Sequence, residues 1–292
     1  MNNYRILSIL VSFLFCASCV HKQSDNNIIT VTIEPQRYFA EQLVDSFFEI
    51  SVMVPPGVSP ETYDPSPVQM VKLAESKAYF RIGQIGFELI WMDKIQGNNP
   101  KLKIFDNSEG ITFISSEEEH GECDDEHHAH VHSGWDPHIW SSPKQAFILA
   151  KNICNSLVSL DEENEEIYRK NLGLLKLKIA ETDSIVTELL NRSKSKSFII
   201  YHPALTYFAR DYGLSQYCIE IDGKEPAPEQ LKKLIELAKK ENIKTVFIQQ
   251  EFDKKNAQII AEETNCDLVV INPLSYHWHE EMVKIAKALL HE

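Results

Sequence analysis

The stretch DEENEEIYRKNLGLLKLKIAETDSIVTELLN, residues 161–191, decides how the chain is organised. It contains no proline, and apolar residues such as Ile167, Leu175 and Ile179 recur at helical spacing. Its acidic start suits the N-terminus of a helix, where the helix dipole is positive. A helix of about 30 residues is about 45 Å long, because each residue adds about 1.5 Å. The pattern therefore predicts one long helix that can run the height of two domains.

Strand-like and helical segments alternate on both sides of this helix. The strand-like runs before it are residues 28–33, 47–54, 78–83 and 102–105. The strand-like runs after it are residues 198–202, 217–221, 245–250 and 267–271. Such alternation predicts parallel sheets with helices on both faces. We therefore expect an α/β protein with two lobes of parallel sheet flanked by helices, joined by one long rigid backbone helix.

The predicted division of the mature chain follows from this pattern. It comprises an N-terminal α/β lobe at 28–160, a linking helix at 161–193 and a C-terminal α/β lobe at 194–292. In such sheets, ligands bind outside the carboxyl ends of the strands. A cleft between two halves is another preferred site.

The beginning of the chain resembles an export signal. Arg5, an apolar run and the small residues Ala17 and Ser18 precede Cys19, which predicts a signal peptide at 1–18. The apolar run is short for a membrane-spanning helix, which needs about 20 residues. The tract FCASC, which ends at Cys19, resembles the bacterial lipoprotein signal. That resemblance implies a lipid on Cys19, a tether at 19–27, and a protein held at a membrane face outside the cytoplasm.

Charge and cysteine content narrow the classes of partner and site. The chain has 29 Lys and Arg against 43 Asp and Glu, so we expect no nucleic-acid partner, which would need a basic surface. No CxxC spacing occurs, which disfavours a structural zinc finger. Cys123 lies among histidines and Cys154 in a helical pattern. An oxidising compartment would allow a disulfide between Cys218 and Cys266, and the sequence leaves this pairing undecided.

Polar residues gather where the predicted strands and loops border the cleft. They are Glu61, His138, His202 and Asn272. Taken singly, each has an ordinary structural reading: a surface carboxylate, a buried histidine or a turn residue. Together they surround one expected cleft, and histidine is the commonest metal ligand among side chains.

A second group of histidines lies in SEEEHGECDDEHHAHVHSG, residues 116–134. This segment has almost no apolar content and is predicted to be a mobile loop. The auxiliary metal-binding residues that we expect on the loop at 118–133 are His120, His127, His128, His130 and His132.

Five tracts, in order along residues 28–290, resemble one protein family. They are GVSPETYDPSP from Gly57, WDPHIWSSP from Trp135, YHPALTYFARDYGL from Tyr201, GKEPAPEQLKKLIELAKKENIKTVFIQQEF from Gly223, and INPL from Ile271. Each is similar to a tract of the solute-binding proteins of zinc and manganese ABC transporters. The resemblance implies two α/β lobes joined by a rigid helix, with a metal ion between the lobes.

Carried over position by position, the resemblance implies the metal ligands Glu61, His138, His202 and Asn272. Two of them depart from the pattern, since the first position is usually His and the last usually a carboxylate. The zinc-type set of that family has a ligand charge of about −1, as the set here has, and the manganese-type set has about −2. Charge and imidazole supply therefore favour Zn2+, with Mn2+ as the alternative. The family's zinc-type members carry a histidine-rich loop that can catch zinc weakly near the cleft.

The resemblance thus implies a lipid-anchored, extracytoplasmic, monomeric receptor in the periplasm or at the cell surface. It would capture Zn2+, deliver it to an ABC permease for import, and catalyse no reaction. Alternatives are a manganese-binding homologue and a surface metal buffer or adhesion lipoprotein. A zinc hydrolase is a further alternative, which would need an open metal position and a base such as Glu251. Neither HExxH nor GxSxG occurs in the chain.

Overall fold

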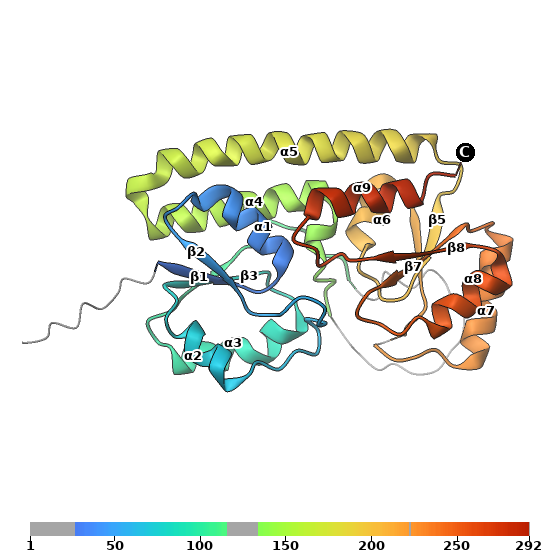
Figure 1. Ribbon diagram of the computed structural model, residues 1–292, viewed down its shortest axis with the longest axis horizontal. Helices are drawn as coiled ribbons and strands as arrows, with labels where there is room; N and C mark the ends of the chain where they lie inside the picture. Colours follow the sequence, from blue (N-terminus) through green and yellow to red (C-terminus); the bar gives the residue numbers. More distant parts are fainter. Residues whose placement is uncertain (1–26, 116–133, 222, 292) are drawn as a thin grey trace, which may run out of the picture.

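One long helix, α5 (Glu165–Arg192), runs along the top of the molecule, and a small sheet lies beneath each of its halves (Figure 1). The computed structural model describes residues 27–115, 134–221 and 223–291. The predicted fold class is confirmed, because both sheets are parallel and covered by helices. The helix begins at Glu165 because residues 162–164 form a separate 3-10 turn.

The N-terminal sheet has the strand order β2-β1-β3-β4. Its strands are β1 (Ile28–Val31), β2 (Glu49–Val52), β3 (Ala78–Arg81) and β4 (Lys103–Asp106). The helices around it are α1 (Glu34–Val44), α2 (Pro67–Leu73), α3 (Gly86–Asn98) and α4 (Pro143–Leu160), with a 3-10 turn η1 at Ile139–Ser141. α1 and α4 lie between this sheet and α5, whereas α2 and α3 cover the opposite face (Figure 1).

The C-terminal sheet repeats this plan with the strand order β6-β5-β7-β8. Its strands are β5 (Ser197–Ile200), β6 (Ser215–Cys218), β7 (Thr245–Gln249) and β8 (Asp267–Ile271). Its helices are α6 (Thr206–Tyr212), α7 (Pro228–Lys240), α8 (Lys255–Thr264) and α9 (Trp278–Ala288). Gly213 ends α6 in the left-handed conformation at φ +66, which glycine adopts without a steric penalty.

Cys218 and Cys266, whose pairing the sequence left undecided, do not form a disulfide. Cys218 ends β6 at one edge of the sheet, and Cys266 precedes β8 at the other edge. Neighbouring strands lie about 4.8 Å apart, so three strand spacings place the two residues well beyond disulfide reach. Cys266 is a free thiol that donates a hydrogen bond to the Ile243 carbonyl at 3.0 Å.

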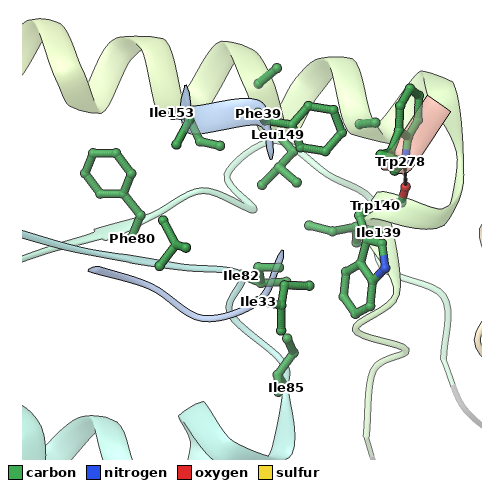
Figure 2. Close-up of a cluster of buried hydrophobic side chains, with 14 of the residues drawn as sticks. Ile33, Phe39, Phe80, Ile82, Ile85, Ile139, Trp140, Leu149, Ile153 and Trp278 are labelled. Atoms are coloured by element: carbon green, nitrogen blue, oxygen red, sulfur yellow. Dashed lines mark hydrogen bonds between the residues drawn. The ribbon is translucent and has the colours of Figure 1, made fainter. Parts of the chain in front are cut away.

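Hydrophobic packing is continuous between the two lobes. A single buried cluster includes Phe39, Phe80 and Leu149 together with Phe198, Phe247 and Trp278. Figure 2 shows its N-terminal part, where the Trp278 indole of the C-terminal lobe donates to the Trp140 carbonyl at 2.7 Å. The Trp140 indole in turn donates to the Pro273 carbonyl at 2.9 Å. We therefore expect the lobes to move little against each other, because interiors this closely packed do not deform continuously.

Within the described part of the chain, no helix combines the length and the apolar character that crossing a bilayer requires. The predicted signal peptide at 1–18, Cys19 and all but the last residue of the tether lie outside the described residues. The same holds for Cys123 and the histidine-rich loop at 118–133.

Candidate metal centre

His138 is held in place by a carboxylate two residues away. It follows Pro137 and directly precedes η1, so its backbone is fixed between two constrained elements. Oδ1 of Asp136 lies 2.6 Å from the His138 backbone nitrogen and 2.9 Å from ring Nδ1. Burial lowers the pKa of His138, but the negative charge and hydrogen bond of Asp136 outweigh that effect and leave the pKa raised.

His202 is held by its neighbours in the C-terminal sheet. It follows β5, and its Nδ1 lies 2.6 Å from Oε1 of Glu220, which follows β6. The side chain of Gln249, at the end of β7, donates to the His202 carbonyl at 2.6 Å and accepts from its backbone N–H at 3.3 Å. The Phe252 ring stacks on the imidazole with centroids 5.5 Å apart. Three neighbouring strands therefore set the position of one histidine.

The two imidazoles meet across the interlobe cleft. Their Nε2 atoms are 3.2 Å apart. Two nitrogens bound to one tetrahedral zinc ion at about 2.0–2.1 Å lie about 3.3–3.4 Å from each other. A carboxylate on each Nδ1 favours the proton there and leaves the lone pair on Nε2, which is the usual support behind a zinc-binding histidine. The pair from His138 and His202 thus has the spacing and the tautomer support of two ligands of one ion.

Two glutamates complete the lining of this cleft. Glu61 accepts a hydrogen bond from the Gly86 backbone N–H at 3.0 Å through Oε2. A Cβ on Gly86 would lie 2.5 Å from the Glu61 carbonyl oxygen, so only glycine permits this approach. Oε1 of Glu61 and Oε2 of Glu251 are buried and have no hydrogen-bond partner within the described residues. Burial raises the pKa of Glu251, while its own backbone N–H and positive charge on His202 or His138 act in the opposite direction.

The space between these side chains is small. A pocket lined by Glu61, His138, His202 and Glu251, together with Trp140 and Pro273, encloses about 10 Å³. That volume is about one water-sized probe, so it suits a single ion rather than an organic substrate. In the described ranges, no group of three or more His, Cys, Asp or Glu side chains is already arranged to hold a metal ion. The imidazole pair is therefore the preformed part of the candidate site, and the Glu61 and Glu251 carboxylates line the same pocket.

Three of the four residues predicted as ligands come together here, and the fourth is engaged elsewhere. Oδ1 of Asn272 accepts a hydrogen bond from the Leu274 backbone N–H at 3.2 Å, and its own N–H donates to Glu281 at 2.7 Å. Its neighbours Pro273 and Leu274 line the pocket, whereas Asn272 does not. Glu251 lines it instead, a residue that the sequence suggests only as the base of a hydrolase. The auxiliary histidines at 120, 127, 128, 130 and 132 lie outside the described residues.

Comparison with known proteins gives consistent matches over almost the whole chain. A family model described as the periplasmic component A of the zinc-uptake complex matches residues 29–289. The high-affinity zinc uptake system protein ZnuA of Bacillus subtilis is 28% identical over 291 residues, covering 94% of this chain and 90% of that protein. The zinc-binding lipoprotein AdcA of Streptococcus pneumoniae is 27% identical over 281 residues, covering 94% of this chain. The chain spans about half the length of AdcA, since the match covers 56% of it.

Solved structures show the same architecture. A crystal structure of ZnuA has a TM-score of 0.81 at 34% identity and covers 89% of this chain and 96% of that one. A ZnuA deletion mutant with zinc bound has a TM-score of 0.80 at 33% identity, covering 91% and 98%. A manganese-bound periplasmic metal-binding protein of Candidatus Liberibacter asiaticus has a TM-score of 0.77 at 18% identity, covering 90% and 99%. At that identity the likeness shows the fold alone.

Proposed function

The chain belongs to the family of zinc-uptake complex component A proteins, and on that premise we propose that it captures one Zn2+ ion between its lobes and delivers it to an ABC permease. The observation that carries this proposal is the pair of facing imidazoles, His138 and His202, with Nε2 atoms 3.2 Å apart and a carboxylate behind each ring. Zinc is tightly held by such supported imidazoles. The protein is a receptor in this account and not an enzyme, because the small pocket suits a single ion and the relatives are named as zinc-uptake and zinc-binding proteins.

Zinc rather than manganese is supported by the relatives. ZnuA of Bacillus subtilis is named as a zinc uptake protein and AdcA of Streptococcus pneumoniae as a zinc-binding lipoprotein. Imidazole ligands also suit zinc better than they suit manganese. Manganese binding is the alternative, because a structural neighbour of the same fold holds that metal.

The protein works outside the cytoplasm and at the membrane in this proposal. A lipid on Cys19, followed by the short tether at 19–27, would keep the receptor near its permease and raise the local concentration of each for the other. The name of AdcA as a lipoprotein supports this arrangement. The chain acts as a monomer, and its histidines at 120, 127, 128, 130 and 132 gather zinc weakly near the cleft.

Competitive titration against a zinc chelator tests the capture site directly. The full chain should bind one tight zinc equivalent in addition to weaker ones. Replacing a residue behind a zinc ligand costs about 10–100-fold in affinity, so His138→Ala and His202→Ala should each cost more than about 100-fold. His277→Ala removes an exposed histidine at the start of α9 and is the matched control. Tight binding that survives in either cleft variant contradicts the proposal.

The two metals and the two kinds of site are separated in the same titration. Excess Mn2+ should not displace the tight zinc equivalent, and displacement would make manganese the cargo. Deleting residues 118–133 should remove the weaker equivalents and leave the tight one. Loss of the tight equivalent on deletion would move the main site onto the loop.

Delivery and anchoring need separate measurements. Zinc-loaded protein mixed with vesicles that hold its permease and ATP should transfer zinc into the vesicle lumen, and zinc that stays on the protein would indicate a buffer. Cys19→Ala should move the protein from the membrane fraction to the soluble fraction. Retention of that variant in the membrane fraction would rule out the lipid anchor.

A further inference from the structure

We propose that Glu251, and not Asn272, is the second metal ligand of the C-terminal lobe, beside His202. This inference rests on the proposed function, since it names a ligand of the same cleft. It changes the ligand set from one glutamate, two histidines and an amide to two glutamates and two histidines.

The position of Glu251 follows from the topology of the C-terminal sheet. Strand β7 lies between β5 and β8, so the residues that follow β7 emerge beside those that follow β5. His202 comes two residues after the end of β5, and Glu251 comes two residues after the end of β7. Because the carboxyl ends of parallel strands meet at one edge of the sheet, both side chains reach the same cleft.

A turn after β7 fixes Glu251 beside the histidine. The Phe252 backbone N–H donates to the Gln249 carbonyl at 3.2 Å and reverses the chain there. The Phe252 ring then stacks on His202, with centroids 5.5 Å apart, and on Tyr201, with centroids 5.0 Å apart. Glu251 thereby lines the same pocket as the His202 imidazole, on a turn that Gln249 ties to the His202 backbone.

The carboxylate of Glu251 has an oxygen that needs a partner. Oε2 is buried in the pocket wall and has no hydrogen-bond partner in the described part of the chain. A buried carboxylate oxygen without a partner is unfavourable because it has lost its water. Glu61 presents an oxygen in the same state from the opposite lobe. A cation between them would satisfy both oxygens at once.

Asn272, by contrast, is already used in its own turn. Its side-chain oxygen accepts from Leu274 and its backbone N–H donates to Glu281. The hydrogen bond from Leu274 holds that oxygen in the Asn272–Leu274 turn, Asn272 does not line the pocket, and an amide is a neutral ligand. Each lobe therefore contributes one histidine and one glutamate, and the ligand charge becomes −2 instead of −1. That is the charge of the manganese-type set, so the preference for Zn2+ rests on the imidazole pair and on the zinc-binding relatives rather than on ligand charge.

Isosteric substitution in the full chain tests this assignment. Zinc affinity is measured by chelator competition for the parent protein, Glu251→Gln and Asn272→Ala. We expect Glu251→Gln to weaken the tight equivalent by more than about 100-fold, since even a partner behind a ligand is worth about 10–100-fold. Asn272→Ala should change affinity by less than about tenfold, the lower end of that range. Glu251→Asp keeps the charge on a shorter side chain and should restore part of the affinity.

The outcomes separate this inference from the proposed function. If Glu251→Gln binds zinc as tightly as the parent, Glu251 is not a ligand, and the inference is overturned while capture stands. If Asn272→Ala alone loses tight binding, the amide is the ligand. If the parent binds no zinc tightly, or if tight binding survives in His138→Ala or in His202→Ala, the proposed function itself fails. Metal-free thermal unfolding of each variant identifies a loss of fold, and partial rescue by Glu251→Asp then still decides the case.

Discussion

The two lobes present matching chemistry to the cleft but hold it by different means. In the N-terminal lobe, one carboxylate within the same short loop fixes both the ring and the backbone of His138. In the C-terminal lobe, the support for His202 comes from two other strands, through Glu220 after β6 and Gln249 in β7. An imidazole can therefore be oriented locally by a loop or globally by a sheet. Substitutions should therefore act differently on the two halves.

The two glutamates that line the cleft, Glu61 and Glu251, are also held by different means. Glu61 is tied to the first residue of α3 through the Gly86 N–H, in a contact that no larger residue would permit. Glu251 is placed by the turn after β7 and by the aromatic stack of Phe252. The N-terminal half thus depends on one close backbone approach, and the C-terminal half on sheet register.

Glu61→Gln should produce the largest effect among the variants that compare the halves. It keeps the side-chain volume but removes the negative charge and one acceptor oxygen from the ion. If each lobe supplies one carboxylate, the loss of zinc affinity should exceed about 100-fold and be similar to that of Glu251→Gln. Chelator competition measures it, with exposed Glu49→Gln as the control. Unchanged binding by Glu61→Gln would remove this residue from the site.

The carboxylates behind the histidines should give the next largest effects. Asp136→Asn and Glu220→Gln each disturb the Nδ1 proton that directs the ring, at a cost of about 10–100-fold in zinc affinity. Asp136→Asn should cost more, because Asp136 also accepts the His138 backbone N–H. Gln249 would still hold the His202 backbone in Glu220→Gln. Equal losses, or a larger loss for Glu220→Gln, would contradict the idea that one loop holds His138 while several strands hold His202.

Gly86→Ala should weaken zinc binding by about tenfold, since it acts on Glu61 through the backbone. The new methyl group would collide with the Glu61 carbonyl oxygen and displace the whole residue. Gly97→Ala lies in the same helix with no heavy atom near its Cβ position, so it controls for the change in helix propensity. The idea that Glu61 depends on this approach fails if the two variants bind zinc equally well.

The last comparison of the two lobes concerns the pH dependence of stability, on which a buried carboxylate of the N-terminal lobe acts without touching the zinc site. Burial raises the pKa of Glu88 to about 7 from 4.5, although Thr32, Ile82 and Gly83 donate to its carboxylate. The C-terminal lobe has a neutral buried amide, Gln249, at the end of its sheet. Burial also raises the pKa of Glu251 in the C-terminal lobe, but the pKa of Glu88 is shifted further, so the N-terminal lobe should make the larger contribution to pH-dependent stability of this kind.

The sign of that dependence follows from proton binding. The native state holds the Glu88 proton at pH values where the unfolded chain has already released it, so stability present below pH 4.5 is lost as pH rises through about 7. The loss in free energy of unfolding is on the order of 3 kcal/mol. Urea unfolding of the metal-free protein at several pH values measures it, and Glu88→Gln should flatten the profile. A parent profile that rises with pH over this window would contradict the raised pKa.

Much of the fold could be predicted because its signals are local. Pro143 suits the first turn of a helix, and α4 runs from Pro143 to Leu160. Alternating strands and helices on both sides of α5 indicated two parallel sheets, and two sheets are present. The start of α5 was less well defined, because the acidic residues 162–164 suit either a helix or the turn that they form.

The candidate site was only partly predictable. His138, His202 and Glu61 lie in tracts with recognisable spacing, and the structure brings them together. Glu251 lies near the end of the tract from Gly223, but nothing in that tract marks it as a ligand, because only the pairing of β7 with β5 and the turn at Phe252 bring it to the cleft. Asn272 shows the reverse case, since its side chain takes the turn role that an Asn at a strand end commonly has. Long-range pairing and local hydrogen bonds decide such cases, and neither has a signature in spacing.

The most direct test is a crystal structure of the zinc-loaded protein with anomalous diffraction at the zinc edge. The account predicts one strong peak between the lobes, about 2.0–2.2 Å from Nε2 of His138, Nε2 of His202 and a carboxylate oxygen of Glu61. An oxygen of Glu251 should complete the coordination, with Asn272 still bonded to Leu274. A zinc peak elsewhere, with none between the two imidazoles, would contradict the account.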